Sequence, residues 1–163
     1  MDNNEQGVYR ETLNENALKN TNEWTQIQQN TYTRWVNAKL KPTNKSITDL
    51  QTDLANGLNL ITLVEVLSKK RIPKYNKKPN FRSQKLENIS ILFRFLAGEG
   101  VFLFNIDSTD IVDGKIKLIL SLIWNIILHF EILMSMKEEG NQGQKTSKQH
   151  LICLLYTSDA ADE

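Results

Sequence analysis

The sequence predicts an all-α protein, and three observations support this fold class. Apolar residues recur at the spacing of about 3.6 residues that gives a helix one buried face. Only one stretch, "VFLF" at 101–104, is typical of a strand, and it is too short to build a sheet. Two prolines, Pro73 and Pro79, fall in a stretch with no helical pattern, and the third, Pro42, falls where a helical pattern stops.

The first helix is predicted to begin at Thr21 or Asn22, because either side chain can cap the N–H groups of a first turn. It should run to about Lys41 and end before Pro42, which cannot continue a helix. Its apolar stripe is expected to comprise Trp24, Ile27, Thr31, Trp35, Ala38 and Leu40.

Three further main helices are predicted at 58–67, 83–96 and 115–132. Asn56 and Gly57 interrupt the apolar pattern before the second helix, and a short helical turn, "TDIVDG", precedes the last one. The residues expected in the core are Trp35, Leu60, Leu63, Leu92, Ile119 and Ile123.

The length of 163 residues is enough for one domain. Residues 1–21 are polar and lack periodicity, so we expect a flexible N-terminal tail there. The helical domain is predicted at 22–132. From about Ser135 onward the chain is rich in Gly, Gln and Lys, which is typical of a linker.

The inventory of reactive side chains argues against an enzyme, a metal site or a bound cofactor. Two histidines and the single cysteine, Cys153, are too few for a metal site or a disulfide framework. No phosphate-binding loop or nucleophile elbow is present, and Asp107, Asp110 and Asp113 are better explained by helix capping than by catalysis. The net charge of +1 gives no indication of nucleic acid. The N-terminus lacks the apolar region of a signal peptide, and we expect an intracellular protein.

The most apolar stretch, "KLILSLIWNIILHF" at 117–130, is too short and too often interrupted for a transmembrane helix, which needs ~20 apolar residues. We expect no transmembrane segment. On a helical wheel most of its apolar residues share one face, but Trp124 and Leu128 fall on the polar stripe with Lys117. Trp124 either belongs to a partner surface or packs under a neighbouring loop.

A run of basic residues between the second and third helices is uninterrupted by any acid. It is either a solvated loop or a docking site for an acidic protein surface or acidic phospholipid. Its members are Lys69, Lys70, Arg71, Lys74, Lys77, Lys78, Arg82 and Lys85.

Two longer motifs carry a resemblance to a known family. They are "QQNTYTRWVN" at 28–37 and "LFNIDSTDIVDGKIKLILSLIWNII" at 103–127. With them, the chain resembles a calponin homology (CH) domain, specifically the first domain of the tandem pair in actin-binding proteins. It is most similar to filamin, with the α-actinin, spectrin and dystrophin groups as alternatives. The resemblance implies an all-α CH fold of four main helices and short connecting helices.

The resemblance also implies a module of a filamin-like crosslinking protein that binds filamentous actin in the cytoplasm, on the actin cytoskeleton. A signalling or adaptor domain and a phosphoinositide-binding peripheral module are the alternatives. The implied actin-binding residues of the first helix are Gln28, Gln29, Thr31, Tyr32, Arg34, Asn37 and Lys39. Those of the last helix are Lys115, Lys117, Ser121, Trp124, Asn125 and Leu128.

Beyond the domain the chain departs from the family pattern. Residues 133–150 are expected to hold a linker and the stub of a truncated second CH domain, and 151–163 to be non-native. We expect the tail from about Asn141 to Glu163 to be disordered, because it has too little apolar periodicity to offset its ordering entropy. Oligomerisation would use only segments outside this chain.

Overall fold

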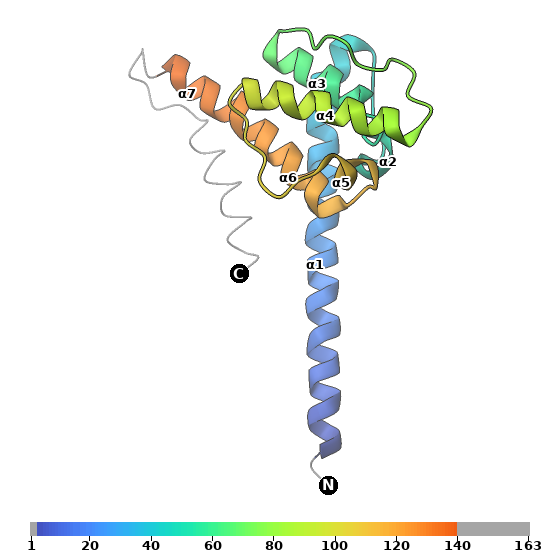
Figure 1. The fold of residues 1–163 in the computed structure, drawn as a ribbon. Coiled ribbons are helices and arrows are strands. Elements are labelled where there is room, and N and C mark those ends of the chain that lie inside the picture. The colour runs from blue at the N-terminus through green and yellow to red at the C-terminus, as the bar shows by residue number, and fades with distance from the viewer. Residues whose placement is uncertain (1–2, 140–163) are drawn as a thin grey trace.

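The computed structural model describes residues 3–139, and the side chains of residues 15–138. Within this range it contains helices and no strand, which confirms the all-α class (Figure 1). In chain order the elements are α1 (Asn3–Leu40), the 3₁₀ helix η1 (Lys41–Thr43), α2 (Leu50–Asp53), α3 (Leu58–Ser68), α4 (Arg82–Gly98), α5 (Ser108–Val112), α6 (Ile116–Ile127), the π-helix η2 (Leu128–Leu133) and α7 (Met134–Glu139).

Helix α1 is much longer than predicted. It begins at Asn3, so the expected start at Thr21 or Asn22 is wrong, and residues 3–21 are helical. Its N-terminal half projects away from the other helices (Figure 1). A helical segment that projects away from the other helices needs no apolar stripe, so hydrophobic periodicity could not reveal it. The segment contains no proline, and most of its residues tolerate a helix.

The buried face of α1 also differs from the predicted stripe. Tyr32, Val36 and Leu40 are buried, whereas Trp24 and Ile27 are exposed. Trp35, which was expected in the core, is only half-buried and packs at its edge. Only the C-terminal part of α1 meets α3 and α6, and the direction of that contact decides which side chains are covered.

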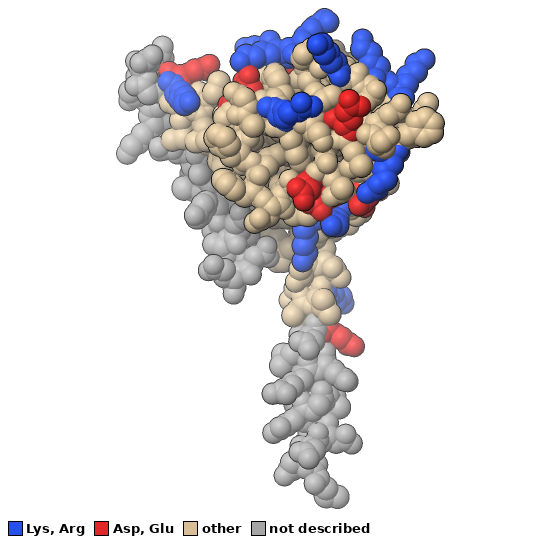
Figure 2. All heavy atoms as spheres, in the orientation of Figure 1, with Lys and Arg blue, Asp and Glu red and all other residues tan. Residues whose placement is uncertain are grey.

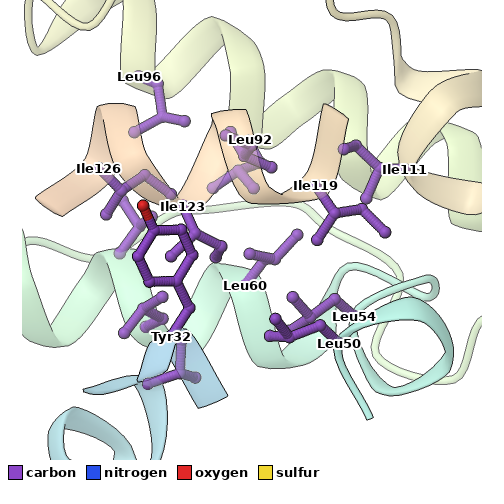
Figure 3. Packing of buried hydrophobic residues seen from close by; sticks show 14 of the residues in the cluster. Tyr32, Leu50, Leu54, Leu60, Leu92, Leu96, Ile111, Ile119, Ile123 and Ile126 are labelled. Carbon is purple, nitrogen blue, oxygen red and sulfur yellow. The ribbon is translucent and has the colours of Figure 1, made fainter. Parts of the chain in front are cut away.

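The core gathers around α6. Leu60 and Leu63 of α3, Leu92 of α4 and Ile119 and Ile123 of α6 are fully buried, as predicted. Figure 3 shows side chains from these helices pointing toward one another around Ile123, with Tyr32 entering from α1. Leu122 is fully buried as well, so α6 is covered over a wider face than the helical wheel predicted.

The continuous helical segment Ile116–Glu138 is, among the described residues, long and apolar enough to cross a membrane, with 23 residues and a mean hydropathy of 1.9. Half of the α6 part of this segment lies in the core, including Ile119, Leu122, Ile123 and Ile126. A buried core helix passes the same test of length and composition. The burial of α6 therefore favours a core helix.

The loops on either side of α3 are held by one buried side chain, that of Asn88 in α4. Its Nδ2 donates to the carbonyl oxygens of Asn56 and Asn76 at 3.0 and 2.9 Å, and its Oδ1 accepts from the backbone N–H of Asn76 at 2.7 Å. Gly57, the predicted helix breaker, has a φ of +82°, and a Cβ atom there would lie 2.8 Å from the Cβ of Asn88. This close approach requires glycine.

Most of the remaining helix ends lie within two residues of their predicted positions. The predicted helices at 58–67 and 83–96 are α3 and α4, and the short turn is α5. The carboxylate of Asp110 accepts from the backbone N–H of Asp107 at 2.9 Å, which confirms a capping role. The last helix does not end at Ile132 as predicted but continues through η2 into α7. The predictions for Asn141–Glu163 lie outside the described residues.

We expect Ile123→Asp to abolish the native fold or to lower the thermal midpoint strongly. The substitution buries an unpaired charge in the middle of the core, which costs several kcal/mol and is comparable with the stability of a whole domain. Ile123→Val, which only removes a methylene, should cost ~0.5–1.5 kcal/mol. Thermal unfolding followed by circular dichroism measures both. An unchanged midpoint in Ile123→Asp would contradict the placement of this side chain.

We expect Asn88→Ala to lower the free energy of unfolding by about 2 kcal/mol or more, because it leaves a backbone N–H and two carbonyl groups without their partner. Asn76→Ala is the matched control, since it removes only an exposed bond from Nδ2 to Glu87 and keeps the backbone of Asn76. Urea unfolding of the two variants compares them. Equal losses of unfolding free energy in the two variants would show that the Asn88 side chain does not hold the two loops.

We expect Asp53 to make stability depend on pH in the acid range. The backbone N–H groups of Asp49 and Thr48 donate to its carboxylate and hold the pKa of Asp53 below its ordinary value. The stabilisation is therefore present above about pH 4 and is lost as the pH falls through the folded-state pKa. Unfolding at a series of pH values should show a shallower acid decline for Asp53→Asn than for the wild type. If the stability of the variant and of the wild type falls in parallel with pH, the Asp53 carboxylate does not cause the acid dependence.

Candidate functional site

A groove lies between the first part of α6 and the stretch of α1 that leaves the helical body. It encloses about 490 Å³. We call it the α1–α6 groove, and its lining residues are Thr21, Trp24, Thr25, Gln28, Tyr32, Lys117, Leu120, Ser121 and Trp124. The structure thus brings together residues from both helices that the resemblance marked, at 28–32 and at 117–124.

The α6 wall of the groove combines an aromatic ring with a cation. Trp124 is half-buried and packs partly against the core, while Lys117 is exposed. Ser121 lies between them along the helix, and Leu120 is buried beneath. Trp124 therefore lines a groove whose opposite wall is α1.

The α1 wall includes residues that the sequence prediction missed. Trp24 is 40% exposed and lines the groove together with Thr21 and Thr25. These residues were placed near the start of the helix or on its inner stripe, so their role as a wall went unrecognised. The signal that could have found them is the absence of proline upstream of Thr21, which allows α1 to extend past the body.

Tyr32 and Asn37, two of the residues marked by the resemblance, make most of their contacts within the domain. Tyr32 is only 8% exposed and belongs to the core, where it forms the floor of the groove. The side chain of Asn37 exchanges two hydrogen bonds with the backbone of Ile47, at 2.8 and 2.7 Å. Asn37 therefore fixes the loop after α1.

The other residues of α1 that the resemblance implied to bind actin lie on different sides of the helix. Gln28 lines the α1–α6 groove, but Gln29 lines a separate cavity of about 330 Å³ against residues 48–51. Thr31 and Arg34 are exposed, and the Thr31 hydroxyl donates to the carbonyl oxygen of Ile27 at 2.9 Å. A contiguous stretch of sequence therefore does not correspond to one surface.

Two of the marked lysines are engaged in ion pairs within the domain. Lys39 pairs with Glu131 of η2, and its Nζ lies 6.0 Å from the ring centroid of Trp35. Lys115 Nζ donates a hydrogen bond of 2.9 Å to a carboxylate oxygen of Asp110, and this bond raises the pKa of Lys115. Among the marked lysines, Lys117 is the one that lines the groove.

The last two marked residues of the C-terminal helical segment lie beside the groove. Asn125 and Leu128 are half-buried and do not line it. Asn125 Nδ2 donates to the carbonyl oxygen of Ser121 at 2.8 Å. One of its amide N–H groups is therefore already paired within the helix.

The basic run forms an exposed positive surface over the loop between α3 and α4 (Figure 2). Lys69, Arg71, Lys74, Lys77 and Lys78 are exposed, and Lys85 is half-buried.

Two members of the run are paired with acids distant in sequence. Lys70 Nζ lies 2.7 Å from Glu99, and Arg82 pairs with Asp113. The Arg82 guanidinium lowers the pKa of Asp113. The prediction of an acid-free run therefore holds along the sequence but not across the fold.

No group of three or more His, Cys, Asp or Glu side chains that could hold a metal ion occurs within the described residues. His129 makes an edge-to-face contact with Phe130, with ring centroids 4.8 Å apart.

Comparison with known proteins identifies the family. Residues 26–132 match the calponin homology (CH) domain family. The chain is 54% identical over 147 residues to Filamin-A of Drosophila melanogaster and 52% identical over 133 residues to Filamin-C of Rattus norvegicus. It is 41% identical over 120 residues to Alpha-actinin-like protein 1 of Schizosaccharomyces pombe.

These alignments cover most of this chain and little of the larger relatives. They span 87% of the chain but 7% of the fly filamin, 79% but 5% of the rat filamin, and 73% but 19% of the yeast protein. The similarity to filamins agrees with the resemblance carried by the two motifs. Because the family match covers residues 26–132 and so includes every main helix of the body, the chain belongs to the calponin homology domain family.

Proposed function

We propose that this chain is an actin-filament-binding module of a filamin-like cytoskeletal crosslinking protein, acting in the cytoplasm on the actin cytoskeleton. The observation that carries the proposal is the α1–α6 groove, where Trp124 and Lys117 stand together on one wall. The proposal assigns the chain no catalytic role and no cofactor.

The names of the relatives support this choice of partner. A fourth relative, 42% identical over 141 residues, is Microtubule-actin cross-linking factor 1 of Rattus norvegicus, whose name states that it cross-links microtubules and actin. The alignment covers 86% of this chain and 2% of that protein. The actin-crosslinking role comes to this chain as part of the proposal.

The chemistry of the groove suits a partner surface that is partly apolar and partly acidic. Two indole rings, Trp24 and Trp124, supply large contact areas, and tryptophan is enriched among the residues that dominate binding energy. Lys117 supplies a positive charge at the exposed edge. Such a charge mainly raises the association rate and makes binding sensitive to salt.

The marked residues that face elsewhere fit supporting roles in this proposal. Asn37 fixes the loop after α1, and Lys39 joins α1 to η2 through Glu131. Both keep the two helices of the groove in a constant relative position. We therefore assign binding to the groove residues and positioning to Asn37 and Lys39.

We expect the wild-type chain to co-sediment with actin filaments at low salt, with micromolar or weaker affinity, about −8 kcal/mol or less in magnitude. Trp124→Ala should weaken binding by ~2 kcal/mol or more, a factor of about 30, because it removes an anchor at the centre of the site. Phe104→Ala is the matched control, since it removes a ring that is 81% exposed and does not line the groove.

Trp124 packs partly against the core, so each variant must first be checked for a native helical spectrum. Lys117→Glu gives a second test that leaves the core untouched, and it should weaken binding more at low salt than at high salt. Absence of the folded wild type from the actin pellet would refute the proposed partner. Normal pelleting of both Trp124→Ala and Lys117→Glu would refute the groove as the site.

A further inference from the structure

We propose that Asn56 is a site of spontaneous deamidation, and that its isoaspartyl product releases the loop that Asn88 holds before α3. Asn56 is the only asparagine in the chain that glycine follows. The fold itself requires this glycine, since Gly57 has a φ of +82° and lies too close to Asn88 for a Cβ atom. The residue that the packing demands is therefore also the one that leaves the Asn56 side chain open to attack. The proposal does not rest on actin binding.

Deamidation at this position needs only the chain itself and water. The backbone nitrogen of Gly57 loses its proton to hydroxide, and its lone pair attacks Cγ of Asn56, with no Cβ atom to hinder it. The bond from Cγ to Nδ2 then breaks, ammonia leaves with a proton taken from water, and a succinimide ring remains. Water opens this ring at Cγ to give aspartate. Opening at the backbone carbonyl carbon gives isoaspartate, in which the main chain runs through Cβ and Cγ.

The structure prepares the Asn56 side chain for this reaction. Its Oδ1 accepts a hydrogen bond of 3.0 Å from the backbone N–H of Leu58, so the side chain is folded back along the peptide bond to Gly57. The same N–H group stabilises the negative charge that develops on Oδ1 when the nitrogen attacks. It belongs to the first turn of α3, where the positive end of the helix dipole adds to this effect. Asn56 is half-buried, so solvent reaches its side chain.

One hydrogen bond opposes the attack. The backbone N–H of Gly57 donates to the carbonyl oxygen of Leu54 at 3.2 Å, and this bond must open before the nitrogen can lose its proton. The distance is at the long end of the range for such bonds. The opening involves only the turn between α2 and α3, and local openings of this kind cost less than global unfolding. The reaction therefore proceeds in the folded chain.

The two products differ in their effect on the fold. Aspartate leaves the main chain unchanged, and its carboxylate still accepts from the N–H of Leu58 at the positive end of α3. Isoaspartate instead inserts a methylene group into the main chain between residues 56 and 57. At this point Gly57 packs against Asn88, whose amide donates to the carbonyl oxygen of Asn56 at 3.0 Å. A lengthened main chain cannot keep both contacts, so isoaspartate separates the loop from Asn88.

The test ages the folded full chain in buffers of neutral and mildly alkaline pH. Peptide mapping by mass spectrometry measures deamidation at each asparagine, and methyl transfer by an isoaspartate methyltransferase measures isoaspartate. Asn44 and Asn80 are the internal controls, since both are exposed and precede residues with large side chains. The control variant is Asn56→Ser, whose hydroxyl can still accept from the N–H of Leu58 but which has no amide to lose.

We expect Asn56 to deamidate at least about tenfold faster than Asn44 and Asn80, because only Asn56 precedes a residue without a Cβ atom. The rate should rise with pH, since the attacking nitrogen must lose a proton. Isoaspartate should accumulate in the wild type and not in Asn56→Ser. Deamidation of Asn56 no faster than that of the two internal controls would overturn the site.

Thermal unfolding separates the effects of the two products. Asn56→Asp reproduces the aspartyl product alone and should keep the wild-type midpoint. The deamidated fraction of the aged wild type, separated by ion exchange and shown to contain isoaspartate, should unfold at a lower temperature than Asn56→Asp. The same midpoint in both would overturn the release of the loop from Asn88.

Discussion

The structure depends on the burial of one wide face of α6. Ile119, Leu122, Ile123 and Ile126 are fully inaccessible to solvent, and complete burial of such a side chain contributes ~1.5–3 kcal/mol. To cover this face, the chain places other helices against α6 from several directions. Lys117 is the one exposed residue of α6, and Ser121 and Trp124 beside it are half-buried. The position of the groove is therefore a consequence of the packing of the core.

Helix α1 serves two purposes because it is longer than the body that it packs on. Its C-terminal turns place Tyr32, Val36 and Leu40 in the core, and this anchors the helix firmly. The same helix then continues past the body and presents Trp24 opposite α6. A groove wall on a continuous helix is better held than one on a loop, since its position follows from the buried turns.

The parts of the fold that were predicted correctly from sequence are those with a one-sided apolar pattern. The segments α3, α4 and α6 bury Leu60, Leu92 and Ile123 as expected, because burial of one face imposes helical spacing on the sequence. The N-terminal part of α1 was missed because residues 15–21 are exposed and need no such pattern. Trp35 was misplaced since the direction from which α3 and α6 approach α1 is a tertiary property. The groove was predicted only in part: the resemblance marked Lys117 and Trp124, but not Trp24.

The sequence also predicts the charged surface only in part. A run such as 69–85 shows where cations are numerous, but it does not show which of them lack partners, because Glu99 and Asp113 reach Lys70 and Arg82 only through the fold. These two pairs divide an apparently uniform run into neutralised and uncompensated positions. Lys69 and Arg71 form no ion pair within residues 15–138, and they border a cavity between η1 and the C-terminal end of α3. Pairing between distant residues thus decides where a basic surface can attract an anion, and that selection is visible only in three dimensions.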